Sequence, residues 1–379
     1  MHKNLIIDNF KCFSQRKNII LGDISILLGG NSVGKSTVIQ SILLIRQIYE
    51  KTKQLSNSEH ELLSIQLNDY YGLQLGDAEH IKSSVNKDEI TLEIDGIYFY
   101  LISSPDNAYE LQTRLNCDLK KIRMKKGLFS DDFYYLSAER MGPRNYQIID
   151  SREVKSCGIY GENTGHYFYK HVNDTVDEKL CFKKETATSL FLQKQVEYWM
   201  DYIVPGINIR TDELLDLRLS KIQYKQHTLD TDFLSPYSFG FGISYTLPII
   251  ITGLSAKKDS VLIVENPEAH LHPLGQSHIG YFLAKVSFSG VQVIVETHSE
   301  HVVNGIRIAA LEEKIEPNRL SLNYFSIEDM EDVNSIIKYR HSVEHISLNN
   351  RMDIEKWPTG FFDQEENDLE KLRMLRREV

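Results

Sequence analysis

The hydrophobic pattern of this chain divides it into buried strands and the helices that follow them. Four short apolar runs have the length and composition typical of strands that are buried on both faces. Helical segments follow three of these runs, and this alternation predicts a parallel sheet with helices packed on it. The strands are predicted at residues 24–28, 133–138, 261–264 and 291–295, and the helices at residues 38–45, at residues 274–287 and from about residue 299.

Alternating apolar and polar residues in the first third of the chain predict an antiparallel β region. Residues 5–10 and 18–21 are expected to pair as strands. Residues 89–102 alternate on either side of Asp95-Gly96, a dipeptide favoured in the turns of β-hairpins. The predicted fold class is therefore α/β, with a mixed sheet and an antiparallel β region.

The middle of the chain is less regular and is interpreted as an insertion. Residues 186–203 have the spacing of an amphipathic helix, and Pro205 with the glycine after it would end that helix. We therefore predict an N-terminal lobe at residues 1–143, a helical insertion at residues 144–230 and a C-terminal lobe at residues 231–379.

The end of the chain predicts a segment that caps the core. Leu369, Leu372 and Leu375 recur at helical spacing, which is typical of an amphipathic helix. Residues 357–364 read Trp-Pro-Thr-Gly-Phe-Phe-Asp-Gln. We expect these aromatic residues to be clamped onto the core, and a patch that docks a partner is the alternative.

Composition narrows the classes of protein to which the chain can belong. The formal net charge of −10 argues against a protein coated with nucleic acid, although a local basic patch is compatible with it. The four cysteines include no C-x-x-C pair, so neither a zinc site nor a redox motif is indicated, and scattered thiols fit a reducing cytoplasm. The longest apolar run, near residues 245–256, is too short to span a bilayer. We expect a cytoplasmic protein without a membrane segment.

A phosphate-binding loop lies between the first buried strand and the helix after it. Its spacing is G-x-x-x-x-G-K-[ST], and a glycine-rich turn that leads into a helix N-terminus directs backbone N–H groups at phosphate oxygens. Lys35 would reach the β- and γ-phosphates, and the Ser36 hydroxyl would ligate Mg²⁺. The predicted loop consists of Gly29, Gly30, Asn31, Ser32, Val33, Gly34, Lys35, Ser36 and Thr37.

Three further motifs follow the loop along the chain. The strand at residues 261–264 ends in Glu265, which is the geometry of a Walker B motif, where a carboxylate holds the Mg²⁺ of a nucleotide. His298 comes just beyond the next strand. A Ser/Gly turn that opens a helix precedes the Walker B strand, and it contains Ser238, Gly240 and Gly242.

The order of these motifs resembles that of ABC-type ATPase heads of the chromosome-maintenance, RecF and OLD group, and the resemblance covers nearly the whole chain. It is closest to a prokaryotic family of AAA or ABC-like ATPases. That family has Glu-Asn-Pro-Glu at Walker B, here residues 265–268, and a C-terminal Trp-Pro-x-Gly-Phe-Phe-Asp-Gln segment, here residues 357–364. Relatives occur in anti-phage defence systems.

The resemblance implies ATP and Mg²⁺ as cofactors and a role for each residue after the Walker B strand. Glu265 stands in place of the aspartate on the Mg²⁺ side, and Asn266 stands in place of the catalytic glutamate. An amide cannot take a proton from water, so hydrolysis is expected to be slow, with Glu268 as the candidate base. His298 matches the switch histidine that contacts the γ-phosphate.

The same resemblance implies a dimer. Ser238, Gly240 and Gly242 match the signature motif, which in such heads caps the γ-phosphate of the opposite subunit. A composite site of this kind needs two chains arranged head to tail. Glu139 or Arg140 falls where the Q-loop of these heads lies.

We therefore expect an ATP-driven switch or sensor that passes its nucleotide state to a separate effector. Family analogy implies a nuclease-like effector in anti-phage defence. One alternative is an assembly module that binds ATP and hardly hydrolyses it, which Asn266 favours. Another is a DNA-repair or nuclease-associated ATPase that binds DNA through a basic run, for which a solvated loop is the alternative. This run consists of Lys120, Lys121, Arg123, Lys125 and Lys126.

Overall fold

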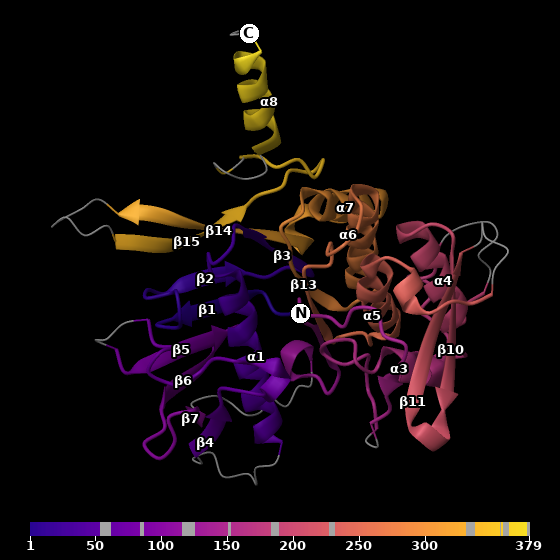
Figure 1. Cartoon of the computed structure of the whole chain (residues 1–379). Helices are drawn as coiled ribbons and strands as arrows, with labels where there is room; N and C mark the ends of the chain where they lie inside the picture. Colours follow the sequence, from indigo (N-terminus) through magenta and orange to yellow (C-terminus); the bar gives the residue numbers. More distant parts are fainter. Residues whose placement is uncertain are drawn as a thin grey trace.

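The structure, a computed structural model of the whole chain, is drawn in Figure 1. The description covers residues 1–53, 62–83, 87–115, 126–150, 153–182, 189–226, 232–330, 338–356, 358 and 364–376. Most of the predicted basic run, all but Lys126, lies outside these residues, as do Trp357 and residues 359–363 of the C-terminal motif.

A mixed sheet forms the centre of the described part of the chain. Its strand order is β15-β14-β3-β13-β12-β8, and every neighbouring pair is parallel except β14 with β15. The four buried strands expected from the sequence are all members of this sheet, and the α/β fold class is confirmed. The strands are β3 (Ile24–Gly29), β8 (Phe133–Leu136), β12 (Val261–Glu265), β13 (Gln292–Glu296), β14 (Leu320–Met330) and β15 (Lys338–Ile346).

Side chains of the central strands alternate between two hydrophobic clusters, one on each face of the sheet. On β12, Leu262 and Val264 pack on one face, and Val261 and Ile263 pack on the other. Both faces of these strands are buried from solvent, which explains why their sequences are continuous apolar runs.

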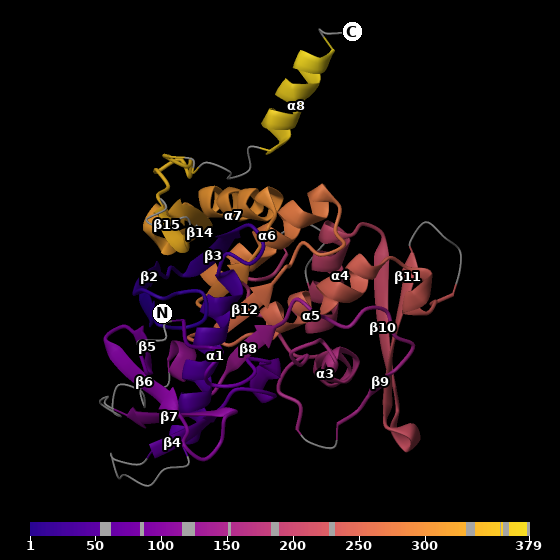
Figure 2. The same ribbon diagram turned by 60° about the vertical axis from the view of Figure 1, so that its left-hand side comes forward.

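An antiparallel sheet and α1 (Lys35–Thr52) cover one of these faces (Figure 2). The predicted hairpin is present, and both residues of its turn have positive φ, 47° at Asp95 and 80° at Gly96. Within the described residues the strand order of this sheet is β2-β1-β5-β6-β7-β4. Its strands are β1 (Asn4–Asp8), β2 (Lys17–Ile20), β4 (Leu62–Gln66), β5 (Glu89–Ile94), β6 (Ile97–Ser103) and β7 (Glu110–Leu115).

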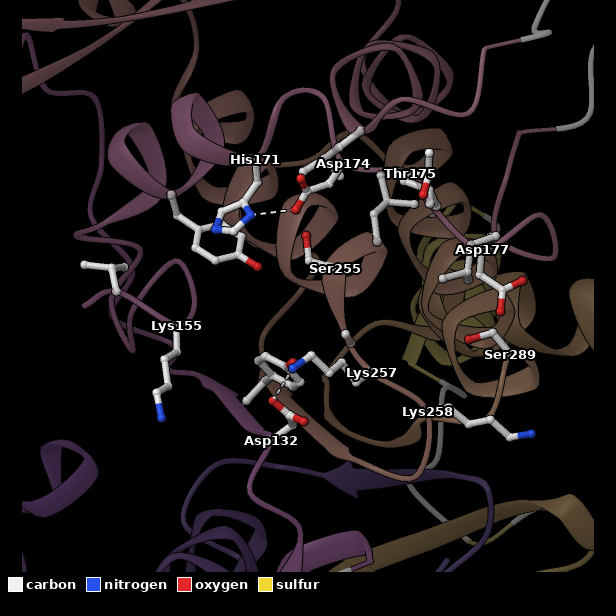
Figure 3. Close-up of a pocket in the computed structure, with 18 of the residues that line it drawn as sticks. Asp132, Lys155, His171, Asp174, Thr175, Asp177, Ser255, Lys257, Lys258 and Ser289 are labelled. Atoms are coloured by element: carbon white, nitrogen blue, oxygen red, sulfur yellow. Dashed lines mark hydrogen bonds and ion pairs between the residues drawn. The ribbon is translucent and has the colours of Figure 1, made fainter.

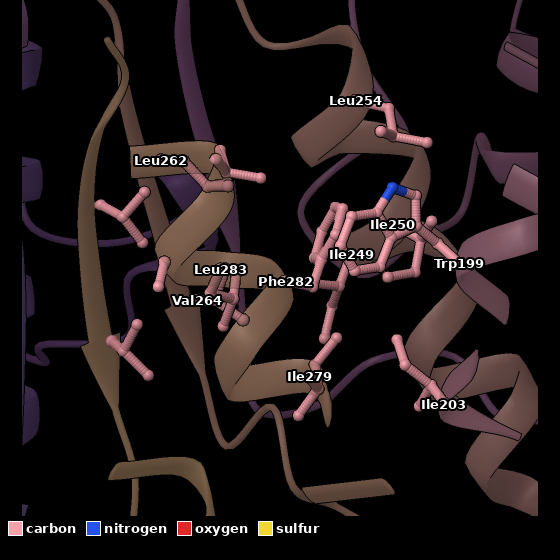
Figure 4. Close-up of a cluster of buried hydrophobic side chains, with 14 of the residues drawn as sticks. Trp199, Ile203, Ile249, Ile250, Leu254, Leu262, Val264, Ile279, Phe282 and Leu283 are labelled. Atoms are coloured by element: carbon pink, nitrogen blue, oxygen red, sulfur yellow. The ribbon is translucent and has the colours of Figure 1, made fainter. Parts of the chain in front are cut away.

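Helices cover the other face. Trp199, Ile250 and Phe282 come from three different helices and pack against the Leu262 side of β12 (Figure 4). Fully burying one such side chain contributes about 1.5–3 kcal/mol, so this cluster anchors the helices on the sheet. The helices are α3 (Thr164–His171), α4 (Leu192–Ile203), α5 (Phe241–Ser255), α6 (Pro273–Phe288) and α7 (Glu300–Glu312).

The predicted insertion at residues 144–230 contains strands as well as the helices α3 and α4. Three strands form a small antiparallel sheet in the order β10-β11-β9 within the described residues. In β10 only Ile207 and Ile209 are buried, so its sequence lacks the apolar run by which the central strands were predicted. The description of this segment as helical was therefore incomplete. The strands are β9 (Gln147–Ile148), β10 (Ile207–Leu214) and β11 (Leu219–Gln226).

The C-terminal helix forms as predicted but does not cap the core. Figures 1 and 2 show α8 (Gln364–Leu375) projecting away from the rest of the molecule. Leu369, Leu372 and Leu375, which were expected to face the core, are each about half exposed. Three leucines spaced by three residues make a narrower stripe than a core-facing helix normally has.

No helix among the described residues is long and apolar enough to cross a membrane.

Candidate nucleotide-binding site

The P-loop connects β3 to α1, as predicted, and two of its glycines are required by close packing. Gly29 has φ 138°, and a Cβ there would lie 2.2 Å from the carbonyl oxygen of Phe325. Gly34 has φ 116°, and a Cβ there would lie 2.7 Å from the ring of Phe13. Side chains are therefore excluded at both positions, and the backbone can make the turn that ends at the N-terminus of α1.

Lys35 lies inside this loop and is 3% exposed. Its Nζ donates hydrogen bonds to the carbonyl oxygens of Gly29, at 3.0 Å, and of Gly30. Burial lowers the pKa of Lys35, and the nearby Glu296 carboxylate opposes that effect. The ammonium group is thus held at the loop where phosphate oxygens would bind.

A cavity of about 500 Å³ opens beside the loop, a size suited to a small-molecule ligand. Most of the P-loop residues predicted to bind the nucleotide line it, as do Asn266 and His298. Val33, which was also predicted to bind the nucleotide, does not line the cavity. It is buried, and its carbonyl oxygen lies 3.1 Å from His341 Nδ1, so it attaches the loop to β15. The lining residues are Lys11, Cys12, Asn31, Ser32, Gly34, Lys35, Ser36, Thr37, Gln40, Asn266, Glu296 and His298.

The sequence analysis missed four lining residues, Lys11, Cys12, Gln40 and Glu296, and Glu296 is the acidic one. It ends β13, and its two carboxylate oxygens lie 3.2 and 3.3 Å from the Ser36 hydroxyl. Its Oε1 lies 3.9 Å from the Nζ of Lys35. Burial, and then repulsion from Glu265, raise the pKa of Glu296 to about 7. The signal in the sequence was a second acidic residue at the end of a buried strand, directly before the histidine motif.

Glu265, the predicted metal ligand, has other partners. It pairs in register with Glu296 on the neighbouring strand. Its carboxylate accepts hydrogen bonds from the Tyr135 hydroxyl at 3.0 Å and from the Ala138 amide at 3.2 Å. Burial is the largest cause that raises the pKa of this carboxyl group. Glu265 does not line the described cavity, so the structure brings Glu296 and not Glu265 to Ser36.

Asn266 lies at the cavity wall with an unusual backbone. Its φ is 43°, and its amide donates to the carbonyl oxygen of Glu296 at 2.8 Å. Its Oδ1 is buried and accepts no hydrogen bond from any described residue. A buried carbonyl oxygen without a donor is costly, so this atom has unused capacity to accept a hydrogen bond.

Arg140 holds the end of the Walker B strand. Its guanidinium donates to the carbonyl oxygens of Glu265 at 2.6 Å, Asn266 at 2.7 Å and Ser137 at 2.8 Å. Its Nε also donates to the carbonyl oxygen of Tyr245 in α5, at 3.1 Å. Burial lowers the pKa of Arg140 to about 10. Arg140 is therefore a positioning residue that ties the loop after β8 to β12 and to α5.

Glu268, the predicted base, is engaged with the loop that follows β13. Its Oε2 accepts from the Thr297 hydroxyl at 2.7 Å, and its Oε1 accepts from the His298 amide at 2.8 Å. Glu268 is absent from the described cavity lining, whereas the His298 that it positions is present. Burial, and then the Lys35 charge, lower the pKa of His298, which favours a neutral imidazole beside the P-loop.

The predicted signature turn lies outside this cavity. A short 3₁₀ turn, Pro236–Ser238, leads to Gly240 at the start of α5, and both Ser238 and Gly240 are exposed. Gly242 is buried against the loop after β12, where a Cβ would lie 2.6 Å from the carbonyl oxygen of His270. The turn is thus attached to the Walker B loop and faces solvent.

Residues 24–304, about three quarters of the chain, match the model of a family described as "AAA domain, putative AbiEii toxin, Type IV TA system". The chain belongs to this AAA-domain family. The match confirms the predicted membership among AAA or ABC-like ATPases, a kind of protein that binds nucleotide. Residues 315–372 of this chain also match a family described as "Protein of unknown function (DUF3696)". No curated protein matches the chain.

Among solved structures, the AAA-domain chain is similar to heads of SMC proteins. One is an SMC head bound to the C-winged helix domain of ScpA, with 12% identity and a TM-score of 0.48 over 92% of this chain and 98% of that chain. Another is the SMC head domain from Thermotoga maritima, with 12% identity and a TM-score of 0.43 over 92% and 99%. A third is the Pyrococcus furiosus Smc head bound to the C-terminal domain of ScpA, with 13% identity and a TM-score of 0.44 over 98% and 99%.

A second cavity of the AAA domain, about 660 Å³, is lined by residues just before β8 and β12 (Figure 3). Asp132 and Lys257 line it just before β8 and β12 begin, and their side chains form an ion pair at 3.3 Å. His171 and Asp174, three residues apart at the end of α3, form a second pair on the wall of this cavity, at 2.6 Å. Ligands of open α/β sheets bind at the carboxyl ends of strands, where the P-loop cavity lies, and this second cavity is at the amino ends.

Proposed function

We propose that this protein is an ATPase that binds ATP·Mg²⁺ between two head-to-tail copies and acts as a nucleotide-dependent switch for a separate effector. The observation that carries the proposal is the separation of two motifs within one chain. The P-loop cavity has residues for the phosphates and the cation, and the signature turn is exposed and absent from that cavity's described lining.

The residues of the cavity fit ATP and Mg²⁺. The N-terminus of α1 and the Lys35 ammonium suit the phosphates, and the Ser36 hydroxyl suits the cation. Bound Mg²⁺ would supply positive charge to the phosphate oxygens. His298, held by Glu268, would contact the terminal phosphate. The unpartnered Oδ1 of Asn266 could accept a hydrogen bond from the attacking water but could not take its proton, so we expect slow turnover.

The composite site is supported by the surface around the signature turn. Tyr237 is 60% exposed and Phe241 is 54% exposed, on either side of Ser238 and Gly240. Two large aromatic side chains exposed next to small residues suit burial against a second copy, which could then approach the backbone closely. The turn would cap the γ-phosphate held by the other chain.

The role of a switch for a nuclease-like effector in anti-phage defence rests on the resemblance and on the family description. That description names a putative AbiEii toxin of a type IV TA system, which supports a function in a system of more than one component. Asn266 favours one alternative, an assembly module in which ATP binding without turnover is sufficient. For direct DNA binding, Lys126 is the residue of the basic run that the structure describes, and it is exposed. The experiment below tests this alternative by adding duplex DNA.

The experiment that tests the proposal measures ATP turnover and oligomeric state together. Purified protein would be compared with Lys35→Ala and Glu268→Gln, with and without duplex DNA, by isothermal titration with ATP, by phosphate release and by light scattering after gel filtration. ATP-dependent dimers with slow turnover support the switch. Tight ATP binding without turnover favours the assembly module, stimulation by DNA favours the DNA-binding alternative, and an absence of ATP binding rejects all three.

A further inference from the structure

Glu296 occupies the position at which the cation of a bound nucleotide would be expected. In the central sheet, β13 lies between the P-loop strand β3 and the Walker B strand β12. Glu296 pairs in register with Leu27, two residues before the loop begins. Its side chain therefore lies at the end of the sheet where the parallel strands terminate, beside the first turn of α1. Both of its carboxylate oxygens contact the Ser36 hydroxyl.

We propose that Glu296, together with Ser36, holds the Mg²⁺ of the bound nucleotide, and that Glu265 is not a ligand of this cation. The inference rests on the proposed function, because it requires ATP at the P-loop. It moves the metal-binding carboxylate from the expected Walker B strand to the next strand of the sheet.

The hydrogen bonds of the two carboxylates distinguish them. The oxygens of Glu265 are taken by Tyr135 and Ala138, which lie on β8 and just after it, on the side of β12 away from the P-loop. A turn of Glu265 toward Ser36 would leave the partly buried Tyr135 hydroxyl and Ala138 amide without their acceptor, which is unfavourable. Glu296 already faces Ser36, so a cation would replace only its contacts with Ser36 and Lys35 in α1.

The chemistry of Mg²⁺ agrees with so small a set of protein ligands. Mg²⁺ keeps several waters and is usually bound by one or two carboxylates together with the phosphates of the substrate. Among the described residues no group of three or more histidine, cysteine, aspartate or glutamate side chains could hold a metal alone. A hydroxyl and one carboxylate beside a phosphate loop therefore suit a cation that shares its ligands with ATP.

The placement of Glu296 also explains how a buried carboxylate is tolerated. The residue is 6% exposed, and Lys35 at 3.9 Å is its cationic partner in the described part of the chain. A buried carboxylate is stable only with a compensating charge or hydrogen bonds. A divalent cation would provide that charge when Lys35 binds the phosphates.

The test measures metal binding and not activity. Mn²⁺ would serve as the probe, and its affinity for the protein saturated with a non-hydrolysable ATP analogue would be measured by electron paramagnetic resonance. We expect Glu296→Gln to weaken Mn²⁺ binding at least about tenfold, since even residues that only orient a ligand change metal affinity by about 10–100-fold. The matched variant Glu265→Gln should change it much less. Ser36→Ala, which removes the other proposed ligand, should weaken it as Glu296→Gln does.

Each failure has a separate meaning. For every variant, the affinity of the same ATP analogue in EDTA shows whether the P-loop is intact, and thermal unfolding shows whether the chain is folded. Wild-type Mn²⁺ affinity in Glu296→Gln overturns the inference. A loss confined to Glu265→Gln overturns it in favour of the Walker B residue. If the wild-type protein binds no ATP, the proposed function fails before this inference is reached.

Discussion

The P-loop cavity and the signature turn both border the loop after β12, but they differ in how many partners their side chains find within one chain. Lys35 and Glu296 are nearly buried and contact each other and the loop. Tyr237 and Phe241, beside the signature serine, are more than half exposed. The first region has its electrostatic partners in place in a single copy, whereas the second presents apolar surface to solvent.

This difference suggests a division of tasks. A preorganised cavity can bind ATP without a second copy, because its polar groups need little rearrangement. Under the proposed function, the exposed turn would contribute only after a second copy binds. Variants in the two regions should therefore affect different measurements, nucleotide affinity in one case and association in the other.

The largest effect is expected from Lys35→Ala. The substitution removes the ammonium that contacts Gly29, Gly30 and Glu296, and it leaves a buried carboxylate without its cation. Losing the charge-assisted contacts of this ammonium with the bound phosphates should cost more than about 3 kcal/mol of binding free energy, which corresponds to a loss of more than about 100-fold in ATP affinity. Isothermal titration with Lys258→Ala as the control would measure it. Tight ATP binding by Lys35→Ala would remove the phosphate-binding role of the loop.

Ser238→Arg should abolish ATP-dependent dimers and leave ATP affinity within about threefold, because substitutions of exposed residues usually change free energies by less than about 0.5 kcal/mol. The bulky cation would stand between two copies at the turn. Light scattering with a non-hydrolysable analogue measures the dimer. Ser347→Arg, at another exposed serine, is the matched control. A normal dimer in Ser238→Arg would contradict the composite site and leave the turn as ordinary surface.

Arg140→Lys should weaken the connection between the two regions. Arg140 donates to carbonyl oxygens at the end of β12 and in α5, the helix that the signature turn opens. A lysine cannot bridge these acceptors, and leaving buried acceptors unpaired costs about 1–3 kcal/mol. We expect the free energy of unfolding in urea to fall by about that amount. Arg144→Lys, an exposed residue of the same loop, should leave it unchanged. Equal stability of the two variants would show that Arg140 is not structural.

The contrast between the two regions also explains what could be predicted from the sequence. The P-loop is continuous in sequence, so its spacing was sufficient to predict it. The signature turn was predicted from its position before the Walker B strand and from the resemblance, and its role stays a prediction. The choice between Glu265 and Glu296 was different, because each ends a buried strand and is followed by polar residues. Only the sheet order, with β13 next to β3, decides which carboxylate lies beside Ser36, and that order is not contained in local periodicity.

Two misses have the same origin in tertiary contacts. The strands β10 and β11 were missed because their burial is partial and their sequences are polar. The helix α8 was predicted from its leucine spacing, but spacing does not determine whether a surface is available to cover it. Elements with dense apolar patterns were predicted well, and their neighbours in space were not.

The smallest predicted effect is protection of Cys12 from alkylation by ATP·Mg²⁺. Its Sγ lies 3.5 Å from the Thr37 hydroxyl at the cavity wall, so a bound nucleotide should restrict access to it. Cys181 lies in the insertion and outside this cavity, so its labelling rate should not change. Cys157 is buried, and burial raises its pKa to about 12, so it should stay unlabelled.

Peptide mapping by mass spectrometry after a short maleimide pulse separates these cysteines. Burial also raises the pKa of Cys12, so its labelling should quicken as pH rises and more thiolate forms. Protection should be the same for the wild type and for Ser238→Arg, because Cys12 and the P-loop line one cavity of a single chain. Protection that requires the dimer would instead mean that the cavity, like the signature turn, is finished only by a second copy.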